Sequence, residues 1–169
     1  MAEAASRQES PSRPKPKSES RAAFTERGST KKCAFCAIVA GEASAREVYR
    51  DDDFVAFLDA HPVFEGHVLM VPTRHVQTYD ELPAELAAPW LRTSQALVRA
   101  VESTMDADGS LLIVNNVVSQ SVPHLHLHVI PRSKGDGLRF WLGPRHAYAS
   151  PEEADAVAAR IRAALETAP

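Results

Sequence analysis

The sequence predicts an α+β domain in which an antiparallel five-stranded sheet is combined with one long helix and a C-terminal helix. Two observations carry this prediction. Three strand-like segments come first, a long helical segment follows, and two more strands and a second helix complete the order. The chain has 169 residues, of which 44% are hydrophobic, and this is enough for one domain with a substantial core.

Residues 1–32 differ in composition from the rest of the chain. They contain eight Lys or Arg against four Glu, with three prolines and almost no apolar periodicity, which predicts a disordered basic N-terminal tail. Residues 33–169 are predicted to form the domain, and they carry a formal charge of −7 because the whole chain has −3 and the tail +4. Contact with polyanions would suit such a tail, but a solvated extension is the simpler interpretation, and nucleic-acid binding is not expected.

Targeting signals are not evident in the sequence. No apolar run approaches membrane-spanning length, and no apolar region of a secretory signal follows the first positive charges. Glu3, Glu9 and Glu19 disfavour a mitochondrial transit peptide. We therefore expect a cytoplasmic protein that does not associate with a membrane.

Three antiparallel strands are predicted in the first half of the domain. Runs rich in β-branched and aromatic residues occupy Glu47–Arg50, Phe54–Leu58 and residues 67–72. The acidic residues 51–53 and the proline- and glycine-containing residues 61–66 separate these runs as turns. This order predicts an antiparallel meander.

A long amphipathic helix is predicted over residues 83–105. Apolar residues recur on one side at helical spacing, namely Leu86, Trp90, Leu97, Val98 and Val101. Pro83 suits the first turn of a helix. Pro89 would cost about 3 kcal/mol in a helix interior, so we expect a kink there or a helix that starts late.

A second hairpin and a last helix complete the domain. Residues 110–114 form an apolar strand, which leads through Asn115 and Asn116 into a strand rich in histidine. Residues 150–153 read Ser-Pro-Glu-Glu, the composition of a capped helix start. The apolar stripe of this helix consists of Ala154, Val157, Ala158, Ile161 and Leu165. We expect this stripe to pack on the sheet.

Three of the seven histidines alternate with apolar residues in the segment 120–132. Successive side chains of a strand point to opposite faces, so His124, His126 and His128 share one face and the apolar residues share the other. Same-face neighbours lie roughly 7 Å apart, so three imidazoles fit around one phosphate-sized site. A half-buried strand with polar residues outward is the plainer interpretation. The donors offered by Gln120 and Ser121 just before the histidines favour an anion site.

Both cysteines occur in the run Cys33-Ala-Phe-Cys36. This spacing suits a metal knuckle or a redox pair better than a structural disulfide in a reducing compartment. A tetrahedral zinc needs two further ligands, for which His75 and His124 are candidates. A thioredoxin-like redox motif lacks its βαβ context here, and two unligated buried thiols are the remaining alternative.

The run His-Leu-His-Leu-His-Val-Ile at residues 124–130 resembles the signature of the histidine triad (HIT) family of nucleotide-binding hydrolases and transferases. The resemblance extends through residues 54–59, residues 66–72 and His75, and covers roughly residues 33–140. It implies a HIT-like fold. It also implies a homodimer in which two sheets join into one continuous sheet, an arrangement that covers an otherwise exposed edge.

A structural zinc ion is a further implication of the resemblance. Many bacterial members of the family carry zinc on positions that match Cys33, Cys36, His75 and His124. The chain therefore resembles a bacterial-type, zinc-containing member. Such a closed site would tie the start of the domain to the histidine segment and leave the metal no open position for chemistry.

The activity implied by the resemblance is cleavage at the α-phosphate of a purine nucleotide derivative through a nucleotidyl-histidine intermediate. His126 matches the nucleophile, His124 and His128 support it, and the carbonyl of His124 matches the acceptor that orients its ring. Dinucleoside polyphosphates and nucleoside phosphoramidates are both candidate substrates of such an adenine-nucleotide hydrolase or nucleotidyl transferase, and a phosphorylase is not excluded. The alternative is a non-catalytic nucleotide-binding regulator or interaction module with structural zinc.

The remaining binding positions are also implied by the resemblance. Asp59 matches the residue that meets the ribose hydroxyls. The expected phosphate donors are Asn115, Asn116, Gln120, Ser121 and His128. The expected base contacts are Phe35, Ile38, Phe54, Phe57 and Leu58, although core packing explains each of them as well.

Two departures from the family pattern affect the phosphate loop. Ser119 stands where many relatives have Gly, and Asn115 lies nine residues before His124 where they have Asn or Gln eleven residues before. These differences predict a shorter, stiffer loop and leave open which Asn reaches the phosphate. Lys134 and Arg139, in the extension after the histidines, are candidates for holding a longer polyphosphate.

Overall fold

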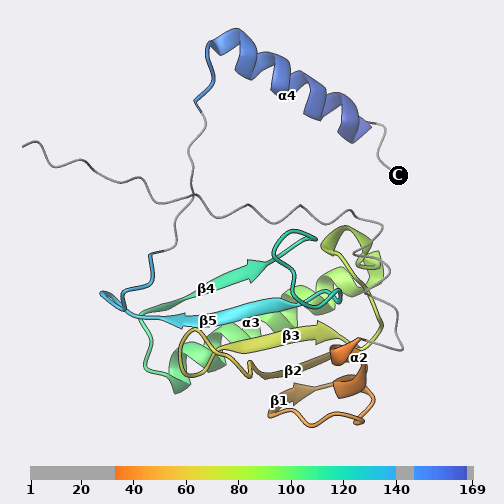
Figure 1. The fold of residues 1–169 in the computed structure, drawn as a ribbon, viewed down its shortest axis with the longest axis vertical. Coiled ribbons are helices and arrows are strands. Elements are labelled where there is room, and N and C mark those ends of the chain that lie inside the picture. The colour runs from red at the N-terminus through yellow and green to blue at the C-terminus, as the bar shows by residue number, and fades with distance from the viewer. Residues whose placement is uncertain (1–32, 140–146, 167–169) are drawn as a thin grey trace, which may run out of the picture. The chain divides into compact units, whose positions relative to one another are not determined.

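The computed structural model describes residues 33–139 and 147–166, and the predicted N-terminal tail lies outside these ranges. The chain divides into two units, the first of which ends at Lys134. In chain order this unit contains helix α2 (Ala34–Val39), strands β1 (Glu47–Arg50), β2 (Phe54–Leu58) and β3 (Val68–Pro72), the 3-10 helices η2 (Tyr79–Glu81) and η3 (Ala84–Leu86), helix α3 (Ala87–Thr104), and strands β4 (Gly109–Val114) and β5 (Leu127–Arg132) (Figure 1).

The five strands form one antiparallel sheet in the order β1-β2-β3-β5-β4. The first three strands run as the predicted meander. Strands β4 and β5 form the predicted hairpin, in which Val114 pairs with Leu127 and Gly109 with Arg132. The α+β prediction is thus confirmed, and β1 and β4 are the two edge strands of the sheet.

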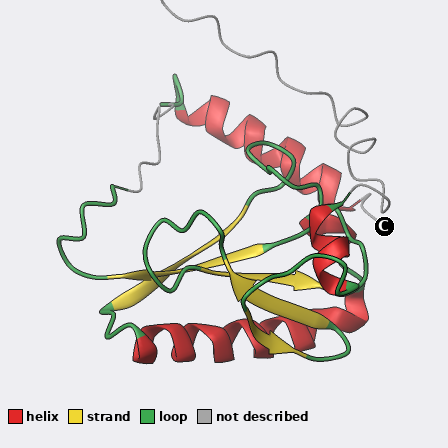
Figure 2. Ribbon diagram, turned by 60° about the horizontal axis from the view of Figure 1, so that its bottom comes forward, coloured by secondary structure: helices red, strands yellow, loops and turns green. Residues whose placement is uncertain are grey.

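Side chains of the sheet alternate between two apolar clusters, as expected for strands buried on both faces. Helix α3 runs along one face of the sheet (Figure 2). Phe54 and Ala56 of β2 pack on the α3 side, whereas Val55 and Phe57 join Phe35 of α2 in the other cluster. The sheet therefore separates an α3 side from an α2 side.

Helix α3 starts late, as Pro89 led us to expect. Residues 84–86 form a separate 3-10 turn, and Pro89 is the third residue of the α-helix. The first-turn N–H groups of a helix have no intrahelical acceptor, so proline removes no hydrogen bond at this position. The buried residues of α3 are Trp90, Thr93, Ser94, Leu97 and Val101.

Strand β5 is shorter than the predicted histidine strand. It begins at Leu127, so only His128 of the three histidines belongs to the sheet. His124 and His126 lie in an irregular segment before it, where the Leu125 N–H donates to the Val76 carbonyl at 2.6 Å. The predicted alternation nevertheless persists, because Leu125, like residues 127 and 129, belongs to the cluster on the α3 side.

The second unit contains helix α4 (Pro151–Glu166). Its start carries the predicted cap, because the Glu153 N–H donates to Ser150 Oγ at 3.3 Å. No residue of α4 is buried, and Ile161 and Leu165 are exposed, so its packing on the sheet stays a prediction. Within the described residues, no helix has the length and apolar character needed to cross a membrane.

Candidate functional site

Helix α2 and the segments after β3 and before β5 bring four potential metal ligands together. Cys33 caps the N-terminus of α2, where its Sγ accepts from the Cys36 N–H at 3.4 Å. The Cys36 Sγ lies 3.1 Å from Nδ1 of His75 and 3.6 Å from Nδ1 of His124, and the Cys33 Sγ lies 3.4 Å from the latter atom. All four ligand atoms lie within 4.8 Å of one another. The four residues expected as metal ligands are thus clustered.

The geometry and chemistry of this cluster fit a tetrahedral cation such as Zn²⁺. Zinc bonds of about 2.3 Å to sulfur and 2.1 Å to nitrogen place tetrahedral S and N ligands roughly 3.6 Å apart. The Nε2–H of His124 donates to the Pro72 carbonyl at 2.9 Å, which leaves the Nδ1 lone pair directed at the cysteines. Burial lowers the pKa of His124 to about 4, so this ring is neutral.

The Cys36 thiol is disfavoured as a bare thiolate. Burial raises the pKa of Cys36 to about 12, and the neighbouring Cys33 adds to this through a hydrogen bond and charge repulsion. Two thiolates side by side would therefore need a cation between the two sulfur atoms.

His126 is held as a neutral imidazole with one defined proton. Its Nδ1–H donates to the His124 carbonyl at 2.7 Å, and because a carbonyl only accepts, Nε2 carries the lone pair. Burial lowers the pKa of His126, although the bond to that carbonyl opposes the effect. The Phe35 ring packs edge-on against it at 5.2 Å. Such an imidazole has the form of a nucleophile.

His128 faces His126 at a ring separation of 4.9 Å and presents a donor. The Val63 N–H donates to Nδ1 of His67, so the Nε2–H of His67 donates to Nδ1 of His128 at 3.0 Å. Nε2 of His128 then carries the proton. This atom is buried, and within the described part of the chain it has no hydrogen-bond partner. Burial, together with His126 and His67, lowers the pKa of His128 to about 4.

His67 is the residue of this cluster that our sequence analysis missed. It lies just before β3 and is 2% exposed. Burial lowers its pKa, and Asp59, whose Oδ2 lies 3.5 Å from Nδ1, acts in the opposite direction. The preceding Gly66 has a φ of 82°, and a Cβ there would fall 2.5 Å from Cγ of Met105. A Gly-His pair opening an apolar strand was the available signal.

The two asparagines of the loop before His124 differ in their hydrogen bonding. Asn116 is tied back to η2, because its Oδ1 accepts from the Tyr79 N–H at 2.8 Å and its Nδ2 donates to Asp80 at 3.2 Å. Asn115 is half-buried, and its side chain makes no hydrogen bond that the described residues reveal. Ser119 has a φ of 64°, the left-handed conformation that glycine adopts most readily.

The residues expected to contact the nucleotide differ in exposure and in the face of the sheet on which they lie. Ser121 is exposed before the triad, and Asp59 accepts from the His61 N–H at 2.9 Å while lying beside His67. The candidates for base contact divide by exposure and by face of the sheet. Phe35 and Phe57 are buried against each other, Ile38 is half-buried, Leu58 is exposed, and Phe54 packs on Trp90 on the α3 side.

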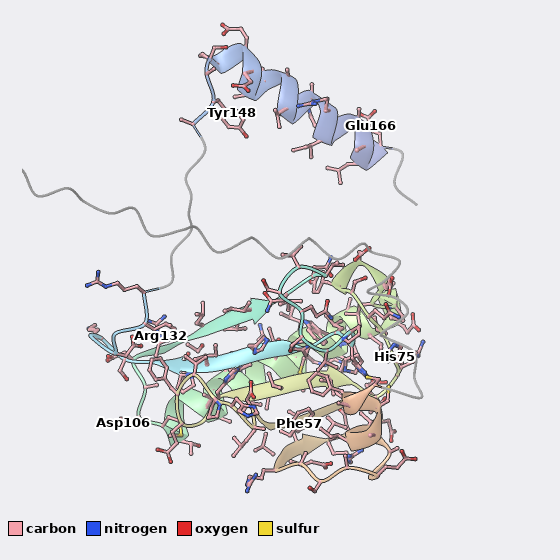
Figure 3. The ribbon with its side chains drawn as sticks, in the orientation of Figure 1. Phe57, His75, Asp106, Arg132, Tyr148 and Glu166 are labelled. Atoms are coloured by element: carbon pink, nitrogen blue, oxygen red, sulfur yellow. The ribbon has the colours of Figure 1, made fainter. Side chains whose placement is uncertain are left out.

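Lys134 is far from the triad in its own chain. His75 lies at the α2 end of the sheet, whereas Arg132 and Asp106 lie at the opposite end (Figure 3). Six strand residues span about 20 Å, so Lys134 is separated from His128 by most of the length of the sheet. The backbone N–H of Lys134 donates to Asp108 at 2.7 Å. This placement does not support its predicted contact with a polyphosphate.

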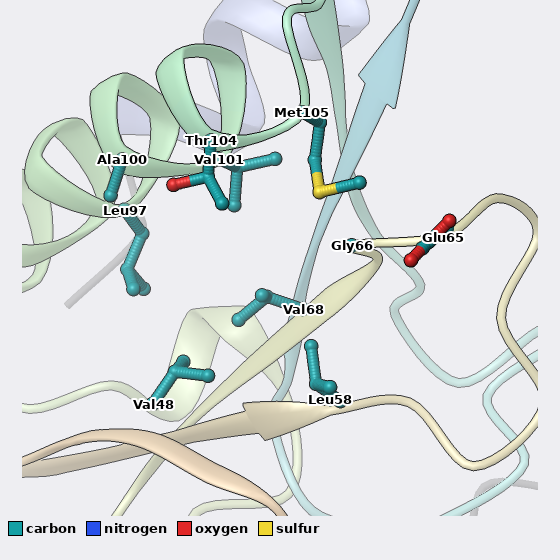
Figure 4. Close-up of a pocket in the computed structure, with 10 residues that line it drawn as sticks. All are labelled: Val48, Leu58, Glu65, Gly66, Val68, Leu97, Ala100, Val101, Thr104 and Met105. Carbon is teal, nitrogen blue, oxygen red and sulfur yellow. The ribbon is translucent and has the colours of Figure 1, made fainter.

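An apolar pocket of about 310 Å³ lies on the α3 side and is distinct from the histidine cluster (Figure 4). Leu97, Val101 and Met105 form its helical wall, and Val48, Leu58 and Val68 line it from the strands. The polar groups expected of a nucleotide site are largely missing from this lining, since Glu65 and Thr104 alone supply polar side chains.

Buried neutral histidines at one end of an antiparallel α+β sheet define the class of histidine triad proteins. A family model of the HIT domain matches residues 40–135. The chain belongs to the HIT family.

Relatives in several organisms agree with this assignment. An uncharacterized HIT-like protein of Mycobacterium tuberculosis is 40% identical over 108 residues, covering 63% of this chain and 75% of the relative. The adenylylsulfatase HINT3 of Arabidopsis thaliana is 31% identical over 142 residues, covering 81% of this chain and 71% of the relative.

Solved structures show the same fold. A HIT family protein from Bacillus subtilis superposes with a TM-score of 0.70 at 35% identity, covering 77% of this chain and 94% of the other. A zinc-bound histidine triad family protein from Mycobacterium smegmatis superposes with a TM-score of 0.61 at 34% identity, covering 80% and 99%.

Proposed function

We propose that this protein is a nucleotide hydrolase or nucleotidyl transferase that cleaves at the α-phosphate through a covalent nucleotidyl-histidine intermediate. The observation that carries the proposal is the 2.7 Å hydrogen bond from Nδ1–H of His126 to the His124 carbonyl. This bond fixes the tautomer whose Nε2 lone pair can attack phosphorus.

In the first half of the reaction, Nε2 of His126 forms a bond to the α-phosphorus as the bond to the leaving group breaks. The ring becomes positively charged, and the His124 carbonyl stabilises this charge through Nδ1–H. The Nε2–H of His128 donates a hydrogen bond to a phosphoryl or leaving-group oxygen and stabilises the negative charge that develops there, and the leaving group departs with its electron pair. In the second half, water attacks phosphorus and loses a proton to solvent as the bond from phosphorus to Nε2 breaks, and His126 leaves as neutral imidazole that keeps its proton on Nδ1.

The substrate is expected to bind around this nucleophile. We assign Asn115 rather than Asn116 as the loop donor to phosphate, because Asn116 is engaged with η2. Ser121 supplies a further donor, and Asp59 receives the ribose hydroxyls. Ile38, which packs on the α2 side and retains exposure, is better placed for base contact than the buried Phe35 and Phe57. Leu58 lines the pocket on the α3 side and is therefore a weaker candidate.

Zinc is proposed as the metal of the cluster formed by Cys33, Cys36, His75 and His124. When bound it supplies a structural cross-link between α2 and the histidine segment, since all four coordination positions are protein ligands. A zinc–thiolate site needs reduced cysteines, which supports a cytoplasmic location.

The test of the proposed function is a mass spectrum of the intact protein after rapid mixing and acid quench with a nucleotide derivative. We would use diadenosine tetraphosphate, an adenosine phosphoramidate and, because HINT3 is an adenylylsulfatase, adenylyl sulfate. An AMP-sized adduct is expected with at least one of them. Nucleotide binding without an adduct or released AMP from any of the three would favour the non-catalytic regulator.

A homodimer is expected to form through the edge strand β4. Leu112 on this strand is exposed and lines a groove of about 450 Å³ together with Tyr79 and Leu91. Pairing with β4 of a second copy would extend the sheet and cover these side chains. Sedimentation velocity at micromolar concentration should give about twice the chain mass of 18.4 kDa.

Charged substitutions on the two edges locate the interface. Leu112→Glu is expected to yield monomer, because a carboxylate would be buried between the two copies. Val48→Glu makes the same change on the other edge strand, β1, and should leave the dimer intact. A wild-type monomer throughout the micromolar range would contradict the prediction.

A further inference from the structure

The Gln120 side chain was expected among the phosphate donors, yet its amide is fully engaged within the protein. The residue is 3% exposed. Its Oε1 accepts from the Val117 N–H at 2.9 Å, and its Nε2 donates to the carbonyls of Gln77 at 2.7 Å and His124 at 3.2 Å. Both amide hydrogens are therefore used. Neither is left for a phosphate oxygen, which corrects the sequence-based expectation for this side chain.

The His124 carbonyl that Gln120 contacts is the group that orients His126. Its oxygen receives two donors, Nε2–H of Gln120 and Nδ1–H of His126, which matches the two lone pairs of a carbonyl. On the other side of the same peptide, the Leu125 N–H donates to the Val76 carbonyl. This peptide precedes β5, so no ladder of strand hydrogen bonds fixes the direction of its carbonyl. Instead, the side-chain amide of Gln120 fixes the direction of this carbonyl by donating to its oxygen.

The same amide holds a loop in an unfavourable backbone conformation. Val117 has a φ of 68° and Ser119 a φ of 64°, and a β-branched residue such as valine is rarely found in this region. Strained backbone of this kind persists where the surroundings hold it in place. The bond from the Val117 N–H to Oε1 and the bond from the Gln120 N–H to the Val117 carbonyl at 3.3 Å supply this restraint.

We propose that Gln120 is a positioning residue for the nucleophile, because its side-chain amide fixes the carbonyl that sets the tautomer and direction of His126. The inference rests on the proposed function and deepens it at the same site. Gln120 acts through His124 and does not touch the substrate with its side chain. Its loss should therefore affect the chemical step more than substrate binding.

The test compares Gln120→Met and Gln120→Glu with wild type by rapid-quench mass spectrometry and steady-state kinetics. Methionine keeps the approximate length but has no donors. Glutamate still accepts from the Val117 N–H, so it keeps the loop tied, but in its ionised form it has no hydrogen for the His124 carbonyl, and its adduct rate is therefore measured at alkaline pH, where the carboxyl is ionised. Both variants should form the nucleotidyl adduct about 100-fold more slowly, the loss expected when a reacting group is misplaced by about 1 Å. KM should stay within about threefold of wild type.

A spectroscopic signature separates positioning from general stability. The ¹⁵N chemical shifts of His126 should report the Nδ1–H tautomer in wild type and a mixture of tautomers in both variants. Val118→Ala is the matched control, since Val118 lies in the same loop but is 77% exposed, and it should react at the wild-type rate. Zinc content and the unfolding midpoint serve to show that the variants compared are folded.

The outcomes separate this inference from the proposed function on which it rests. Absence of an adduct in wild type would refute the proposed function itself. If wild type forms the adduct and a folded Gln120 variant forms it within about twofold of that rate, the positioning role is refuted. A rise in KM with an unchanged adduct rate would also refute it, because that result assigns the amide to substrate binding. Should Gln120→Met fail to fold, Gln120→Glu and its ¹⁵N spectrum decide the question.

Discussion

Substitution of His126 by alanine is expected to lower turnover by a factor of at least about 10⁴, the scale seen when an enzyme loses its nucleophile. The physical reason is that Nε2 of His126 carries the lone pair that is proposed to attack phosphorus, and the hydrogen bond to the His124 carbonyl fixes the orientation of its ring. His124 and His128 cannot substitute for it, because Nδ1 of His124 faces the cysteines and Nε2 of His128 carries a proton. Steady-state kinetics on the best substrate of the three measures the loss.

Nucleotide binding supplies the control for this variant. Calorimetric titration with AMP should give a Kd within a few-fold of wild type, because the ribose and phosphate donors remain. In His126→Gly, free imidazole at millimolar concentration should restore part of the turnover by entering the space vacated by the ring. Turnover by His126→Ala at more than about one hundredth of the wild-type rate would assign the nucleophile to another group.

Removal of the metal is expected to lower the unfolding midpoint by about 10 °C, which corresponds to roughly 2 kcal/mol or somewhat more for a domain of this size. The cross-link between α2 and the histidine segment is then lost, and the two cysteines must take up protons. Purified protein should contain about one zinc per chain. Cys36→Ala should abolish the zinc content and reproduce the fall in midpoint measured by scanning calorimetry.

Ala34→Ser is the matched control for the metal variants. It directly follows Cys33 on α2, but its side chain is exposed and supplies no ligand atom, so both zinc content and midpoint should be unchanged. Clearly less than one zinc per chain in wild type purified without chelators would refute the zinc assignment. A bound metal whose removal leaves the midpoint unaltered would refute its structural role.

Much of the sheet could be predicted because its strands carry their own signals. Residues 54–58 form an apolar run, residues 47–50 contain Val48 and Tyr49 between charged residues, both segments are bounded by turn residues, and the structure places strands at the same bounds. The late start of α3 also follows from one residue, Pro89, whose ring is tolerated only in the first turn. The spacing of Cys33 and Cys36 pointed to a metal site, but their partners could only be named as candidates until the resemblance supported them, since His75 lies 39 positions after Cys36 along the chain.

The parts that escaped prediction depend on contacts between distant segments. Period-2 alternation predicted a strand through His124, but hydrogen bonds from Gln120 and Leu125 hold that segment outside the ladder. A glutamine beside histidines has several uses, and only the tertiary structure shows that its amide faces inward. His67 was missed for the same reason, since its role depends on the pairing of β3 with β5, which sets Leu69 opposite His128.

Two different parts of His124 contact the cysteine cluster and the proposed nucleophile. The ring belongs to the cysteine cluster, whereas the carbonyl belongs to the nucleophile. Every amino acid has that carbonyl, so a change of side chain at this position would remove a ligand from the cysteine cluster yet leave the acceptor for His126 in place. Loss of the cysteine cluster in a descendant of this chain is therefore compatible with the proposed catalysis, provided that other packing secures the same peptide. The two properties can be separated by mutation even though a single residue carries both.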